Sequence, residues 1–192
     1  MTFEATSTAR PSRLVRWLRR LRRDRSGMAA VEFALLVPIL ATLLLGTLEF
    51  SQALTIDRRV TQIASATADL VAQTDKITTS DFNDIMKIVE QLMKPYPTAP
   101  LKISLVAVLA DSNSQVKVQW SCAYQGGTQY AQGASYSLPS NLVTPMTHVI
   151  IAEVEYFYTP PTGKFLIGGV TLKEKFYLSP RMGSVQKQDG NC

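Results

Sequence analysis

The 192-residue sequence predicts an α+β protein with a long N-terminal transmembrane and amphipathic helix, a second short helix and a small antiparallel sheet of three to four strands. Two observations predict this fold. From residue 28 to about residue 71, an apolar run with a single charged residue passes into a stripe of apolar residues spaced by three or four, which is the period of a helix. From Leu101 onward the apolar period changes to two, which is typical of strands.

The apolar run is long enough to cross a lipid bilayer. Between Met28 and Leu48 the only charged residue is Glu32, and from Phe33 to Leu48 there is no charge. These residues would form about 30 Å of helix at 1.5 Å per residue, which matches the hydrocarbon core of a bilayer. A carboxylate inside such a segment is costly and usually marks a function. Glu32 is therefore expected either to pair with an opposite charge or to serve a function.

The net charge of +5 is concentrated before the apolar run. The first 25 residues hold eight arginines against two carboxylates, a sum of +6, so the remaining residues sum to −1. Arginines beside an apolar span follow the positive-inside rule, which predicts a cytoplasmic basic leader over residues 1–27 and a translocated C-terminal part. Nucleic-acid binding is not expected. The leader is either merely basic or an amphipathic helix on the inner leaflet, built on Leu14, Trp17, Leu18 and Leu21.

The position of Glu32 relative to Gly27 suggests the reason for its charge. Glu32 is the fifth residue after Gly27, which follows the basic leader, and this arrangement resembles the type IV prepilin signal. The resemblance implies that a prepilin peptidase cuts between Gly27 and Met28. It also implies that Glu32 of an incoming subunit neutralises the terminal ammonium of a neighbour, because both charges are costly alone in a low-dielectric helix bundle.

A longer segment sharpens the resemblance. Gly27-Met-Ala-Ala-Val-Glu32-Phe33-Ala-Leu-Leu-Val-Pro38, followed by Gly46-Thr-Leu-Glu49-Phe50, is similar to the TadE family of pseudopilins from the tight-adherence (Flp pilus) system. Two later pieces, Glu153-Val-Glu155-Tyr-Phe-Tyr158 and Ser179-Pro180-Arg181 with a terminal cysteine, resemble the C-terminal half of that family.

The TadE resemblance implies a pilin-like fold and a structural role in pilus assembly and adherence. The implied partners are the prepilin peptidase, the major Flp pilin, other minor pseudopilins, the inner-membrane assembly platform and the lipid bilayer. The chain would be a single-pass inner-membrane protein with its C-terminal domain in the periplasm. It would be a substrate of the peptidase and not itself an enzyme.

The helical pattern continues past the membrane span, so one helix is expected over residues 28–73, followed by a periplasmic α+β domain over residues 74–192. Thr79 or Ser80 is expected to cap a short second helix that ends near Met93. The buried face of this helix is expected to hold Ile85, Ile88 or Val89, and Leu92.

Strands are predicted at 101–109, 116–124, 148–158 and 170–178, with a further short strand at 164–167. The first two would form a hairpin around a turn at 111–114. The alternating residues of the second strand are expected to share one face: Val116, Val118, Trp120, Cys122 and Tyr124. Residues 125–146 are rich in Gly, Ser, Gln and Pro and predict a long surface loop, which is either a partner-binding segment or a simple connection.

The two cysteines, Cys122 and Cys192, both fall on the predicted outer side of the membrane. A disulfide between them would stabilise the fold by about 4 kcal/mol on the chain-entropy model and would hold the C-terminal tail in place. Lone reactive thiols are the alternative.

No catalytic, cofactor or metal site is predicted. The single histidine, His148, has no nucleophile or carboxylate in a known motif, and one histidine with two distant cysteines does not make a zinc site. On neighbouring strands, cross-strand ion pairs at the surface are expected, joining Glu153 and Glu155 with Lys173 and Lys175. A glycosidase-like carboxylate pair is the alternative.

Two other functions stay open at this point. One is an uncleaved signal-anchor protein whose periplasmic domain binds a partner unrelated to pili. The other is a secreted protein that signal peptidase cuts after Ala53 in Ser51-Gln52-Ala53; the long leader and Glu32 argue against it.

Overall fold

The computed structural model describes residues 17, 20, 27–139, 142, 144–161, 168–189 and 192. Most of the predicted leader and the predicted short strand at 164–167 lie outside the described residues. The chain divides into two compact units, residues 1–47 and 48–192.

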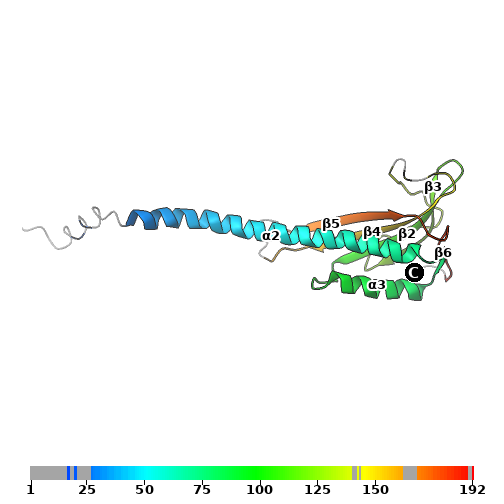
Figure 1. The fold of residues 1–192 in the computed structure, drawn as a ribbon, viewed down its shortest axis with the longest axis horizontal. Helices are drawn as coiled ribbons and strands as arrows, with labels where there is room; N and C mark the ends of the chain where they lie inside the picture. The colour runs from blue at the N-terminus through cyan, green and yellow to red at the C-terminus, as the bar shows by residue number, and fades with distance from the viewer. Residues whose placement is uncertain are drawn as a thin grey trace, which may run out of the picture. The chain divides into compact units, whose positions relative to one another are not determined.

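The longest element is helix α2, Gly27–Ala72, with 46 residues (Figure 1). It matches the predicted helix over 28–73, and Pro38 lies inside it. In the first unit, every residue of the helix up to Leu44 is exposed. In the second unit, one side of the helix is buried from Ile56 onward, at the three- and four-residue spacing that the sequence predicts.

The second helix, α3, spans Thr79–Met93. Its N-cap is Thr78, one residue before the predicted cap, because Thr78 and Asp81 form a capping box: the Thr78 hydroxyl accepts from the Asp81 amide at 3.2 Å, and the Asp81 carboxylate accepts from the Thr78 amide at 2.9 Å.

The predicted buried face of α3 is partly wrong. Ile88 and Leu92 are 49% and 39% exposed, while Val89 is buried as expected and Ile85 is only partly buried. The helix is rotated so that a neighbouring stripe at helical spacing faces the core: Phe82, Met86, Val89 and Met93.

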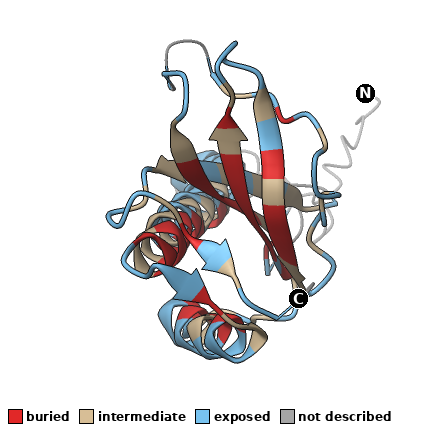
Figure 2. Ribbon diagram, turned by 90° about the vertical axis from the view of Figure 1, so that its right-hand side faces the viewer, coloured by how far each residue is buried: buried red, intermediate tan, exposed pale blue. Residues whose placement is uncertain are grey.

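Four antiparallel strands form the main sheet: β2 (Leu101–Ala110), β3 (Val116–Tyr124), β4 (His148–Tyr158) and β5 (Val170–Leu178). Their order is β3-β2-β4-β5, so β3 and β5 are the edges. Within the second unit the two helices lie on one face of this sheet, and buried residues gather between them (Figure 2). The predicted α+β fold class is confirmed.

A small second sheet was not expected from the sequence. Strand β1 (Lys76–Ile77) pairs in parallel with β6 (Gln186–Lys187), which brings the C-terminal tail beside the link between the two helices. Each strand has only two residues, which is too short for a period to be recognised.

The expectation that one face of β3 holds all five alternating residues is wrong. The register between β2 and β3 shifts between Ala107 and Val108, and Gln119 is the extra residue of a β-bulge. Because the bulge reverses the alternation, Trp120 and Cys122 face the helices, whereas Val118 belongs to a second apolar cluster on the outer face of the sheet.

The long loop after β3 covers that outer face. Tyr136 is buried there, and Tyr130 and Leu138 pack against the same second cluster, which contains Val106 and Ile151. The loop runs so close to β2 that a Cβ on Gly127 would lie 2.2 Å from the Ile103 carbonyl oxygen. The predicted loop is therefore present, but part of it serves as a lid on the sheet rather than as a free surface.

Candidate functional site

The candidate site is the N-terminal half of helix α2. Gly27 is the first residue of the helix, and a Cβ at this position would meet nothing within 4 Å. Met28 follows, and Glu32 lies on the same helix face because it is four residues further on. Both side chains are exposed.

The rest of this half is an apolar surface that no other part of the described chain covers. Exposed fractions are 66% for Phe33 and 51% for Leu48, which bound the predicted anchor. Helix α2 is the one helix among the described residues that is long and apolar enough to cross a membrane. A helix that is apolar on all sides and unburied requires lipid or other helices around it. The geometry therefore indicates a membrane anchor.

A second carboxylate, Glu49, lies just after the apolar run in an opposite environment. Its side chain is only 3% exposed, inside the second unit. Burial raises the pKa of the nearby Tyr158, and the charge of Glu49 raises it further. The two glutamates of this helix thus differ: Glu32 is exposed on the anchor, and Glu49 is enclosed by the folded domain.

Residues 27–69 match the family model described as TadE-like protein. This segment is TadE-like. The resemblance inferred from the glycine, the glutamate and the apolar run is thereby confirmed, and the matched segment begins at the helix start and covers most of α2. Comparison with curated proteins and with solved structures gives no match.

Outside the TadE-like segment, the predicted cross-strand ion pairs are present. Lys173 Nζ lies 2.6 Å from Glu155 Oε1, and Lys175 Nζ lies 2.5 Å from Glu153 Oε1. Glu153, however, is not a surface group as expected: it is 9% exposed because the loop after β3 covers it.

Two loop tyrosines complete the surroundings of Glu153. Tyr136 Oη donates to Glu153 Oε1 at 2.5 Å, and Tyr130 Oη donates to Oε2 at 2.9 Å. Burial opposes ionisation of Glu153, but the hydrogen bonds from Lys175, Tyr136 and Tyr130 outweigh it, so the pKa of Glu153 is lowered. Burial and the adjacent carboxylate raise the pKa of Tyr130 to about 12. This cluster fastens the loop to the sheet, and the sequence offered only the two tyrosines in a polar loop as a signal for it.

The C-terminal tail is held to the domain at several points that follow one another along the chain. Trp120 Nε1 donates to the Val185 carbonyl at 2.7 Å, and the Asp189 carboxylate accepts from the Thr79 amide at 2.9 Å. The last residue, Cys192, lies at disulfide distance from Cys122, with 4.9 Å between the Cα atoms. The tail thus bridges the sheet and the start of α3.

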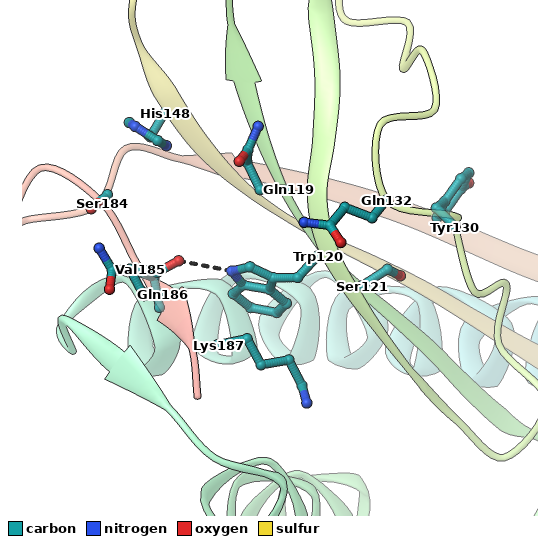
Figure 3. A pocket seen from close by; sticks show the side chains of 10 residues that line it. All are labelled: Gln119, Trp120, Ser121, Tyr130, Gln132, His148, Ser184, Val185, Gln186 and Lys187. Atoms are coloured by element: carbon teal, nitrogen blue, oxygen red, sulfur yellow. Dashed lines mark hydrogen bonds between the residues drawn. The ribbon is translucent and has the colours of Figure 1, made fainter. Parts of the chain in front are cut away.

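A cavity of about 520 Å³ opens beside the edge strand β3 (Figure 3). Amides and hydroxyls dominate its lining, which includes Gln119, Ser121 and Gln132, and His148 lies at the opposite end from Ser121 in this view. No group of three or more potential metal ligands occurs within the part of the chain that the structure describes. The cavity therefore brings together polar side chains without an arrangement that indicates a reaction.

Proposed function

We propose that this protein is a minor pseudopilin that serves as a structural component of Flp-type (tight-adherence) pilus assembly. The observation that carries the proposal is that the TadE-like match begins at Gly27, where an uncovered apolar helix also begins. The part of this helix up to Leu44, which contributes nothing to the core, is available to pack against lipid and then against other subunits. The role is structural rather than catalytic.

The proposed orientation places the N-terminus in the cytoplasm and the folded domain in the periplasm. Eight arginines before the span support the first placement through the positive-inside rule. The cysteine pair at disulfide distance supports the second, because disulfides persist in the oxidising periplasm. The protein would be a single-pass inner-membrane protein before any assembly.

Glu32 has a defined part in this proposal. Cleavage after Gly27 would create an ammonium at Met28, four residues from Glu32 on one helix. In a bundle of such helices, Glu32 of one subunit would pair with the amine of its neighbour and fix their relative register. The proposed partners are the major Flp pilin, other minor pseudopilins and the inner-membrane assembly platform.

The proposal is tested by determining the N-terminus of the mature protein from cells that contain an active prepilin peptidase. Met28 as the first residue is the expected result. Met1 would instead indicate an uncleaved signal anchor, and Leu54 a secreted protein cut after Ala53. Cleavage after Ala53 would cut the chain inside helix α2, at a residue that packs against the main core.

The variant Gly27→Ala is expected to keep its leader, so its intact mass would be that of the precursor. Because a Cβ at this position meets nothing within 4 Å, the substitution does not disturb the described fold, and a loss of cleavage would report recognition by the peptidase. Ala34→Ser, at an exposed position six residues further along the anchor than Met28, is the matched control and should be cleaved normally. Normal cleavage of Gly27→Ala would contradict the site.

A further inference from the structure

Helix α2 keeps an uncharged outer surface beyond the end of the predicted span. The next charged residue after Leu48 is Glu49, which is buried, and the one after that is Asp57. Between them, Phe50 and Leu54 are 59% and 46% exposed. They are four residues apart and so lie on one face of the helix. This exposed apolar face lies in the second unit and follows directly after the apolar run along the chain.

The same end of the second unit carries an aromatic cleft. It has a volume of about 410 Å³, and its lining includes Gln52, Tyr96, Tyr156, Phe157 and Tyr158. Tyr158 Oη donates to Gln52 Oε1 at 3.2 Å, and Tyr156 Oη donates to the Pro97 carbonyl at 3.1 Å. These two bonds hold the end of β4 against α2 and against the turn after α3.

Phe157 differs from its two tyrosine neighbours. Tyr156 and Tyr158 point toward the helices and are 3% and 5% exposed, whereas Phe157 is 46% exposed at the end of β4. A large apolar side chain that is half exposed beside an apolar cleft is costly in water, because its area remains in contact with solvent. The end of the second unit at which its part of α2 begins thus presents apolar groups from two separate elements.

The helix geometry sets how far these groups lie from the end of the predicted membrane span. Gln52 follows Leu48 by four residues, which is about 6 Å along the axis at 1.5 Å per residue. The headgroup layer on each side of a bilayer is about 5–8 Å thick, given a total thickness of 40–45 Å and a core of 30 Å. If the span ends at Leu48, then Phe50, Gln52 and Leu54 fall within or at the border of this layer.

We propose that Phe50, Leu54, Phe157 and the aromatic cleft form a membrane-interface collar that lies in the headgroup layer of the bilayer. The inference rests on the membrane anchor of the proposed function. The half-exposed side chains of Phe50, Leu54 and Phe157 would bury apolar area at the border of the hydrocarbon core. The partly buried Tyr96 in the cleft lining adds an aromatic ring with a polar tip, a group that favours this layer. The bilayer is the occupant to which the collar is directed, because the collar continues along the same helix as the exposed span.

The test uses the full-length protein in vesicles of phosphatidylcholine and phosphatidylglycerol, with one nitroxide label at an introduced cysteine. The native cysteines lie at disulfide distance from each other, so the introduced thiol is the one to be labelled. Phe157→Cys and Leu54→Cys report the collar from two independent elements. Leu43→Cys reports the span. Met182→Cys, at a residue that is 66% exposed and next to the Arg181 amide bonded to the Ala72 carbonyl, reports the far end of α2.

The measurement is the collision rate of each label with oxygen, which partitions into lipid, and with a water-soluble nickel complex. The labels at 157 and 54 are expected to show a nickel collision rate severalfold lower than the label at 182, with a depth between those of the labels at 43 and 182. Labels at 157 and 54 that are as open to nickel as the one at 182 would overturn the collar. Labels at 157 and 54 that collide with neither oxygen nor the nickel complex would also overturn the collar, because that result indicates a protein partner in place of lipid.

The outcome at position 43 separates this inference from the proposal on which it rests. A label at 43 that collides with oxygen and not with nickel supports the anchor, whatever the collar labels report. A label at 43 that is open to nickel would overturn the anchor and the collar together.

Discussion

The two halves of helix α2 are continuous in backbone and opposite in environment. Residues 28–44 are exposed all round, whereas Val60 and Ile63 are fully buried in the second half. Apart from Glu32, the first half is apolar on every side. In the second half, the apolar stripe alternates with charged residues such as Asp57 and Arg58. The difference teaches that the apolar residues of the first half do not stabilise the fold of this chain. They remain available for lipid and for other subunits.

The largest effect expected from this comparison comes from shortening one isoleucine in each half. Ile63→Ala should lower the free energy of unfolding of the second unit by about 2–5 kcal/mol, because it leaves a cavity in the core. Ile39→Ala, at a residue that is 58% exposed, should leave it unchanged. Denaturant unfolding of the detergent-solubilised protein, followed by near-ultraviolet circular dichroism, measures both. Equal losses for the two variants would contradict the division of labour within the helix.

A smaller loss of stability is expected when Glu153, a buried carboxylate, is replaced. Its pKa is lowered in the folded state, so its contribution to stability is complete above its ordinary value of 4.5 and is lost as the pH falls through the lower folded value. Glu153→Gln should therefore reduce the loss of stability that accompanies acidification below about pH 4.5. At neutral pH it should lower the free energy of unfolding by about 1–3 kcal/mol.

The matched control is Glu155→Gln on the same strand. Its side chain is 42% exposed and its partner Lys173 is 63% exposed, so solvent screens the ion pair. The loss of stability should stay below about 1 kcal/mol. Equal acid sensitivity of the two variants would show that burial under the loop after β3 is not what distinguishes Glu153.

The sequence predicted the elements of the fold well because their periods are long and clear. The helix over α2 and the four strands of the main sheet occur where the alternation of apolar residues placed them. The bulge at Gln119 was not predictable in this way. Both faces of the sheet are covered, by helices on one side and by the loop on the other, so reversing the alternation left an apolar pattern on either face.

The errors at α3 and in the loop have related causes. In α3, two neighbouring stripes are both apolar, so helical spacing alone could not choose between Leu92 and Met93. In the loop, a composition rich in Gly and Gln suggested a free surface, yet two tyrosines were enough to bind it to Glu153. Tertiary contacts decided both cases, and local composition carried little trace of them.

The candidate site was more accessible to sequence reasoning than the domain was. Gly27, Met28, Glu32 and the apolar run are adjacent along the chain, so no folding is needed to bring them together. Glu49 is the exception. It stands at the end of an apolar run as Glu32 stands near its start, and only the structure reveals that one acid is buried in the domain and the other is not.

In the proposed function, the exposed half of α2 acts between subunits through the charge of Glu32. The most direct test of this role is the amount of Glu32→Gln protein in purified pili, measured beside its cleavage and its insertion into the inner membrane. Glutamine keeps the size and polarity of the side chain and removes the charge. We predict normal cleavage and insertion with a strong loss of assembly. Normal incorporation of Glu32→Gln into pili would contradict this proposed role of Glu32.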